Sequence, residues 1–288
     1  MSDGQNFIGP YQVLKTIRSG TSTDVFEALR GGSNKRIALK VLRKKFHKDK
    51  EEIRQLKHEA NIGTDLSHPN VIKIHEFYDE QNAMLISMEL FHAPNMKIVM
   101  REKPELIAPN VAPIIRQCAK ALQHLHDKGW VHCDVKPDNY LLNDETVVKL
   151  IDFSIAVKLK QGMLGSLLGG RPKHIQGTRS YMAPEQIRRK TPDQRTDIYG
   201  LGCVVFELMA GRTPYSGTSP DDLLNKHLTA AVPSLEAYSG ASKDMSALVK
   251  KMIAKKPENR FESMAHFLDA LKKVQIYRGG KRPEGFVR

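Results

Sequence analysis

The chain has 288 residues, of which 40% are hydrophobic and 27% are charged, and its net charge is +13 at pH 7. This balance is typical of a folded globular protein and argues against a disordered or fibrous chain. No apolar run approaches the roughly 18 residues of a membrane span, and the first residues lack the basic start and apolar stretch of a secretory signal. We therefore expect no membrane segment in this chain.

Cysteine usage and the spread of basic residues bear on compartment and partners. Cys118, Cys133 and Cys203 are widely spaced and fit neither a disulfide framework nor a zinc site, so we expect a cytoplasmic protein. The 45 Lys and Arg residues occur in small groups. No stretch interleaves them with aromatic residues as a single-strand nucleic-acid groove would. We expect no nucleic-acid partner.

The first ninety residues have a β-rich pattern. Short apolar or alternating runs, separated by turn residues, predict strands over residues 11–17, 25–28, 37–42, 71–77 and 83–89. A charged amphipathic stretch over residues 48–66 has apolar residues at helical spacing and predicts a helix. This helix should stop before Pro69, because proline disfavours helical backbone at the residue ahead of it.

Beyond residue 90 the pattern changes to long helical periods. Helices are predicted over residues 113–128 and 197–210, each closed by a glycine, Gly129 or Gly211, as is common just past a helix end. Two more are predicted over residues 246–254 and 264–273. We therefore divide the chain into an N-terminal extension (1–10), a β-rich lobe (11–90), a helical lobe (91–277) and a basic tail expected to be disordered (278–288).

Residues 131–154 bring together the groups that phosphoryl transfer needs, which are metal ligands, a cation and a carboxylate near the attacking hydroxyl. Asp134 is a candidate to accept or orient the hydroxyl proton, and Lys136 to neutralise charge on a γ-phosphate. Asn139 and Asp152 offer hard oxygen ligands that suit Mg²⁺. Residues 140–142 and 147–150 predict a hairpin that brings these two ligands together.

In this order, the motifs resemble those of the eukaryotic-type (Hanks) protein kinase family over residues 11–275. Residues 132–139 (His-Cys-Asp-Val-Lys-Pro-Asp-Asn) resemble its catalytic loop, 152–154 (Asp-Phe-Ser) its metal-binding motif, and 183–185 (Ala-Pro-Glu) the end of its activation segment. Each motif alone is weak, but together they imply an α+β, protein-kinase-like bilobal fold. Its small antiparallel β-rich N-lobe would carry one key helix, and its larger C-lobe would be α-helical.

The resemblance implies ATP as cofactor, with Mg²⁺ or Mn²⁺. Lys40, in the run Ile-Ala-Leu-Lys, would hold the α- and β-phosphates, and Glu59 in the predicted helix stands where the family places its partner. Asp197 and Arg260 stand at structural positions of the family, and Arg260 is expected to pair with Glu185. The remaining nucleotide contacts implied by the resemblance are Ile17, Gly20, Val25, Ala38, Met88, Glu89, Phe91 and Leu141.

Two local patterns indicate protein Ser/Thr hydroxyls as the acceptors. The Lys-Pro-Asp after Asp134 is typical of Ser/Thr kinases, and the segment 177–185 has the same character. By resemblance, Thr178 would hydrogen-bond Asp134 and Lys136 and hold the loop on which a peptide docks. Glu207, in the helix predicted to begin at Asp197, weakly suggests recognition of basic peptides. The segment 220–228, which we expect to be a loop, resembles the corresponding segment of bacterial members of this kinase family.

The chain departs from the family pattern at several positions. The glycine-rich loop retains only Gly20, and Asp24 adds a charge beside it, so nucleotide binding is expected to be impaired but not abolished. Ser154 replaces the glycine after Asp-Phe. Gly63 replaces a bulky residue that would pack on Phe153, and the hole left there should loosen the helix carrying Glu59 and favour a low-activity, helix-out state.

Cys133 stands where the family usually has the arginine that pairs with a phosphorylated activation segment. A phosphate or phosphomimetic between Ser166 and Ser180 should therefore change the rate little, and a large phosphorylation-dependent gain in rate would contradict this. A small buried thiol is the plainer interpretation of Cys133, and a redox handle beside Asp134 is the alternative.

Three readings of function are open at this point. The first is an active Ser/Thr kinase, and the second is a pseudokinase-like scaffold that binds ATP with little or no transfer. The third, a kinase for small molecules, is disfavoured by the Ala-Pro-Glu region and Thr178, which form a peptide platform. The long segment 152–185 includes a Gly- and Leu-rich stretch over residues 162–170, which we expect to be mobile and to dock on a second copy of the chain, as in a homodimer, or on an activating protein partner.

Overall fold

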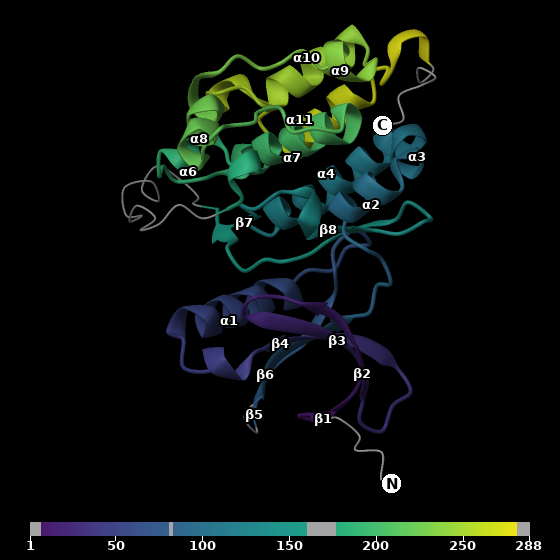
Figure 1. Cartoon of the computed structure of the whole chain (residues 1–288), viewed down its shortest axis with the longest axis vertical. Coiled ribbons are helices and arrows are strands. Elements are labelled where there is room, and N and C mark those ends of the chain that lie inside the picture. Colours follow the sequence, from purple (N-terminus) through teal and green to yellow (C-terminus); the bar gives the residue numbers. More distant parts are fainter. Residues whose placement is uncertain (1–6, 81–82, 160–176, 281–288) are drawn as a thin grey trace. The chain divides into compact units, whose positions relative to one another are not determined.

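The computed structural model describes residues 7–80, 83–159 and 177–280. The chain forms two compact units (Figure 1). The first runs to His92 and also includes Asp152–Ser154, whereas the second contains Ala93–Ile151 and continues from Ile155. The first unit is built on a β-sheet and the second is mainly helical, so the predicted α+β class is confirmed.

An antiparallel sheet forms the frame of the first unit. Its described strands lie in the order β1-β2-β3-β4-β6-β5, and each strand predicted in the first ninety residues is among them. The strands are β1 (Phe7–Ile8), β2 (Tyr11–Ser19), β3 (Thr23–Arg30), β4 (Arg36–Leu42), β5 (Ile74–Glu80) and β6 (Ala83–Glu89).

The register of this sheet decides which side chains share a face. Directly opposed residues on antiparallel strands point to the same side, as do residues two apart on one strand. Val25 opposes Lys40 and Ala38 opposes Met88, so these four side chains lie on one face. The other face carries a buried core that includes Tyr11, Ala28, Ile37, Leu39, Val41 and Leu85.

Helix α1 (Lys50–Thr64) carries Glu59. It begins at Asp49, whose side chain accepts hydrogen bonds from the backbone N–H of Glu51 at 3.0 Å and of Glu52 at 3.3 Å. Such a cap contributes about 1 kcal/mol. The helix predicted over residues 48–66 is confirmed, and it ends earlier than expected because the chain turns at Asp65.

The hole expected beside Gly63 does not exist, and that expectation was wrong. Gly63 is buried, and a Cβ added there would lie 2.2 Å from Cδ1 and 2.7 Å from Cγ1 of Ile74. Ile74, at the start of β5, fills the space that a larger residue on α1 would take. The glycine therefore permits a close approach of helix and strand, and it gives no reason for α1 to be loose.

Gly63→Leu should therefore destabilise the protein and should not raise its activity. Overpacking a filled core costs roughly 1–3 kcal/mol. Urea unfolding should show a lower midpoint for Gly63→Leu than for the wild type. The double variant with Ile74→Ala should recover part of the loss, because the shortened side chain vacates the space. An unchanged midpoint for the single variant would contradict this packing account.

The second unit is built around two long helices, α4 (Val111–Asp127) and α7 (Gln194–Ala210). Gly129 and Gly211 follow them with φ of 81° and 64°, the left-handed conformation that favours glycine after a helix. Nearly all of α7 is buried. The other described helices of this unit are α2 (Met96–Glu102), α3 (Pro104–Ile107), α6 (Pro184–Ile187), α8 (Pro220–Thr229), α9 (Glu236–Ser239), α10 (Lys243–Met252) and α11 (Met264–Leu271).

One expected segment needs correction, and two others contain contacts that were not predicted. Within the segment 1–10, β1 pairs with β2 through a turn at Gly9, whose φ is +56°. The supposed loop at 220–228 is helix α8, capped by Ser219. At the start of the predicted basic tail, the N–H of Arg278 donates to the carbonyl of Gly240 and that of Gly280 to the carbonyl of Tyr277, both at 3.1 Å, and residues 281–288 lie outside the described residues.

Within the described part of the chain, no helix is both long enough and apolar enough to cross a membrane.

Candidate active site

In the first unit, an ion pair joins the sheet to helix α1. Lys40 Nζ lies 2.5 Å from Glu59 Oε2, and both side chains are largely buried. Asp152 Oδ1 lies 3.7 Å from the same ammonium. Because α1 holds Glu59 against Lys40, the structure contradicts the helix-out state that the sequence had led us to expect.

Burial and charge act together on this pair. Burial alone would lower the pKa of Lys40, but the negative charges of Asp152 and Glu59 outweigh it and raise the pKa well above its usual range. Lys40 therefore stays protonated. Burial raises the pKa of the Glu59 carboxyl to about 7, against the attraction of Lys40.

The turn between β2 and β3 contains Gly20, the surviving glycine of the degraded loop. Its N–H donates to the carbonyl of Thr23 at 2.9 Å, and a Cβ at this position would lie 2.7 Å from that oxygen. Asp24 was expected to add a charge here, but Arg43 donates to both of its carboxylate oxygens, at 2.9 and 2.7 Å. These hydrogen bonds lower the pKa of Asp24, and Arg43 balances its charge.

The predicted nucleotide contacts of the first unit lie on neighbouring strands. Val25, Ala38, Lys40 and Met88 share one face of the sheet, as the register requires. Ile17 lies in an irregular part of β2 and is 47% exposed. At the end of β6, the N–H of Glu89 donates to the carbonyl of Lys73 at 2.8 Å, and Phe91 follows two residues later.

In the second unit, Asp197 at the start of α7 holds the loop that precedes Asp134. Its carboxylate accepts the backbone N–H of His132 at 2.8 Å and that of Cys133 at 2.9 Å. The ring of His126 lies 2.8 Å from the same carboxylate. Cys133 has a φ of 67°, unusual for a residue other than glycine, and these bonds hold it there.

Asp134 lies at the centre of a set of hydrogen bonds. Its Oδ2 accepts from Lys136 Nζ at 2.5 Å and from Asn139 Nδ2 at 3.1 Å. Its Oδ1 accepts from the N–H of Thr178 at 3.0 Å and from the Thr178 hydroxyl at 3.2 Å. Lys136 also donates to Thr178 Oγ1 at 2.8 Å. The carboxylate is therefore fixed in position while its side chain remains partly exposed.

The predicted hairpin after Asn139 is present as β8 (Tyr140–Leu142) and β9 (Val148–Leu150), and Leu141 lies on β8. The N–H of Ile151 donates to the carbonyl of Asn139 at 2.9 Å. Asn139 belongs to the second unit and Asp152 to the first. Both amide hydrogens of Asn139 point to Asp134, one to its carbonyl at 2.8 Å and one to its carboxylate at 3.1 Å, so Oδ1 is the atom of this side chain that could bind a metal.

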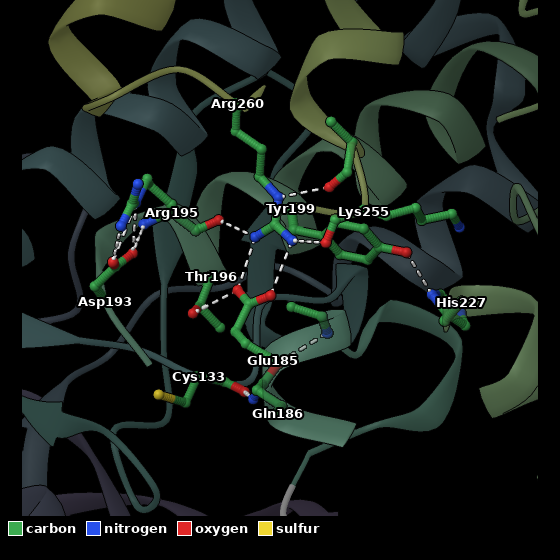
Figure 2. Close-up of polar contacts among 12 residues, drawn as sticks. Cys133, Glu185, Gln186, Asp193, Arg195, Thr196, Tyr199, His227, Lys255 and Arg260 are labelled. Carbon is green, nitrogen blue, oxygen red and sulfur yellow. Dashed lines mark hydrogen bonds and ion pairs between the residues drawn. The ribbon is translucent and has the colours of Figure 1, made fainter. Parts of the chain in front are cut away.

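Behind this loop, Glu185 and Arg260 form the expected ion pair, buried and bidentate, with distances of 2.7 and 2.9 Å (Figure 2). Thr196 donates to the same carboxylate at 2.9 Å, and Arg260 also donates to the carbonyl of Arg195 at 2.9 Å. The pair joins α6 to α7 and to the segment after α10. It therefore fixes the end of the segment that carries Thr178.

Cys133 is a buried thiol, as the plainer interpretation held. Burial raises its pKa well above the usual range, so it does not form the reactive thiolate that a redox site needs.

Sequence reasoning missed one contact of the loop and misjudged another residue. Gln186 donates to the carbonyl of Cys133 at 2.8 Å (Figure 2), and no local pattern marks it. Glu207, considered for basic-peptide recognition, is buried and accepts from Lys97 and, at 2.6 Å, from the hydroxyl of Tyr181. Its carboxylate is therefore engaged inside the protein. The segment over residues 160–176, with its Gly- and Leu-rich stretch, lies outside the described residues.

The chain is similar in sequence to known proteins. Residues 11–271 match the family model described as protein kinase domain. The chain is 30% identical over 266 residues to a probable serine/threonine-protein kinase of Clostridium acetobutylicum, which covers 92% of this chain and 40% of the relative. It is 31% identical over 261 residues to PrkC of Bacillus subtilis, a serine/threonine-protein kinase, with 90% and 40% covered.

A third relative is the serine/threonine-protein kinase PknH of Mycobacterium tuberculosis, 33% identical over 272 residues, with 91% of this chain and 42% of the relative covered. The chain thus spans about two fifths of the length of the curated relatives it matches.

Proposed function

Because the chain belongs to the protein kinase family, we propose that it is an active serine/threonine kinase that transfers the γ-phosphoryl group of ATP to protein hydroxyls. The observation that carries the proposal is the set of hydrogen bonds around Asp134. Lys136, Asn139 and Thr178 converge on this carboxylate, as positioning a hydroxyl for in-line transfer requires. No described feature favours a scaffold without transfer activity.

Each residue of this set has a proposed role. Asp134 orients the acceptor hydroxyl and receives its proton, and the partial exposure of its side chain leaves it accessible to a substrate. Lys136 offsets negative charge on the transferred group. Thr178 positions both side chains through its hydroxyl and its backbone N–H, and it ties them to the segment on which a peptide would dock.

The residues fit ATP with a divalent metal. Lys40 is held protonated by Glu59 and Asp152, so it presents a fixed positive charge for the α- and β-phosphates. Asp152 and Oδ1 of Asn139 are hard oxygen donors of the kind that Mg²⁺ or Mn²⁺ takes. When bound, the metal neutralises charge on the phosphates. We propose that the nucleotide also contacts Ile17, Gly20, Val25, Ala38, Met88, Glu89, Phe91 and Leu141.

Protein substrates and the compartment follow from the same observations. The hydrogen bond between Thr178 and Asp134 joins the segment proposed for peptide docking to the proposed base, which supports a peptide substrate over a small molecule. Cys118, Cys133 and Cys203 are all buried and unpaired, and we propose a cytoplasmic location in keeping with a reducing compartment.

Removal of the metal, and substitution of Lys40 or Asp152, test the proposal. Transfer from γ-labelled ATP to a basic protein should proceed with Mg²⁺ or Mn²⁺ and cease on addition of EDTA. Lys40→Met and Asp152→Asn should each lower it by about a hundredfold or more, because Lys40 supplies the positive charge proposed to face the phosphates and Asp152 the carboxylate proposed to hold the metal. Transfer that persists at the wild-type rate in both variants would contradict the assigned roles.

The ion pair predicts a pH dependence of turnover. Because burial raises the pKa of Glu59 to about 7, its ionised fraction grows as the pH rises through 7, and only the ionised form attracts Lys40. Turnover at saturating ATP should therefore rise between pH 6 and pH 8. Glu59→Gln should be slower at every pH and should lack this rise. The same rise in both proteins would assign the titration to another group.

A further inference from the structure

A cavity of about 440 Å³ lies in the second unit, at the C-terminal end of α7. Its lining residues lie on α2, α3 and the C-terminal end of α7 and also include Tyr277. Its lining is mostly apolar and includes Met100, Ile107, Leu208 and Met209, here called the apolar floor. The volume and the apolar lining match those of sites that bind small molecules.

Lys97 and Arg101, the two cations in the lining, are exposed, whereas its apolar residues are buried or half-buried, so we call these two residues the cationic rim. Glu207 is buried, and its carboxylate is engaged by Lys97 and by the hydroxyl of Tyr181 at 2.6 Å. The Lys97 side chain is 46% exposed, and its ammonium has three N–H groups, so it keeps a donor for a ligand. Arg101 is 74% exposed and pairs with an exposed Glu102, a surface pair that is weak and easily displaced.

Hydrogen bonds connect the cavity wall to the proposed active site. Tyr181, whose hydroxyl donates to Glu207, is the last residue of a 3₁₀ turn (η4, Arg179–Tyr181). The N–H of Tyr181 donates to the carbonyl of Thr178 at 2.9 Å, and Thr178 in turn bonds Asp134 and Lys136. Burial raises the pKa of Tyr181 above its usual range, so its phenol remains a donor. A shift of Lys97 would therefore reach Thr178 through Glu207 and Tyr181.

We propose that this cavity binds an amphipathic carboxylate, with its apolar chain on the floor and its carboxylate at Lys97 and Arg101, and that binding alters the position of Thr178. The apolar floor accounts for the chain and the cationic rim for the anionic head. The regulatory half of this proposal rests on the proposed kinase function, whereas the binding half does not.

Isothermal titration with sodium decanoate, kept below its micelle concentration, tests binding. One saturable site per chain is expected. Met100→Trp, which fills the cavity from a half-buried position, should weaken binding about tenfold or more, and Arg101→Gln about three- to tenfold. Arg116→Gln, an exposed arginine on α4 outside the cavity, is the matched control and should bind like the wild type. No saturable heat, or equal affinity in all variants, would overturn the site.

Peptide kinetics test the connection to Thr178. Saturating decanoate should change the KM for a Ser/Thr peptide at least about twofold in the wild type and leave it unchanged in Met100→Trp. Saturable binding with an unchanged peptide KM would overturn the regulatory half alone. If no preparation transfers phosphate while the calorimetry shows the site, the proposed kinase function fails and the binding site stands.

Discussion

Asp134→Asn should lower kcat for phosphoryl transfer by about 10²- to 10⁴-fold, the range that a positioned general base contributes. The substitution keeps the size of the side chain and an oxygen that can accept from Lys136 or Thr178, but it removes the group that takes the proton. The KM for ATP should change by no more than about twofold, because the interaction lost belongs to the transition state. Steady-state kinetics on a peptide substrate would give both constants.

Asp144→Asn is the matched control for this prediction. Asp144 lies in the turn between β8 and β9, is 76% exposed, and pairs only with the half-exposed Lys103 among the described residues. Its substitution should leave kcat unchanged. Circular dichroism and thermal melting should show both variants folded like the wild type. A kcat for Asp134→Asn within tenfold of the wild type would remove Asp134 from the proposed role.

Arg260→Ala should destabilise the protein by about 3–5 kcal/mol, the usual cost of leaving one partner of a buried ion pair without the other. Arg260 is fully buried, and besides both oxygens of Glu185 it donates to the carbonyls of Ala254 and Arg195. Without Arg260, Thr196 is the remaining described side-chain donor to the buried carboxylate of Glu185. Urea unfolding would measure the loss.

Arg195→Ala is the control for Arg260→Ala, since Arg195 pairs with Asp193 at a half-exposed position in the same view (Figure 2). Its loss should cost less than about 1 kcal/mol, as is usual for surface pairs. If Arg260→Ala does not yield folded protein, Glu185→Gln provides a milder break in the same pair and should still lower the unfolding midpoint. Equal losses in Arg195→Ala and Glu185→Gln would contradict the importance of burial.

The stretch of residues 131–154, with its candidate catalytic and metal-binding residues, was the most predictable part of the chain. Its candidate residues lie within a short stretch of sequence, and their types identify the chemistry, because a carboxylate, a lysine and oxygen ligands at this spacing serve phosphoryl transfer. The sequence also indicated a bacterial member of the family, which the bacterial relatives confirm. The strands and long helices followed from hydrophobic periodicity, since burial of one face sets that pattern.

The structural features that could not be predicted from the sequence depend on contacts between residues far apart in the chain. Gly63 suggested a hole because local reasoning cannot see that Ile74 occupies the space beside it. The engagement of Glu207 by Lys97 joins residues far apart in the chain, with no local pattern to mark it. Helix α8 was different, because Ser219 followed by proline and two aspartates is a recognisable helix start that was read as a loop.

The central claim is that this chain is an active kinase for Ser and Thr, and phosphoamino acid analysis of its reaction products tests it most directly. The purified chain, a generic basic protein and γ-labelled ATP with Mg²⁺ should yield labelled phosphoserine or phosphothreonine. Label on tyrosine, or no label under conditions in which a known kinase labels the same protein, would contradict the account.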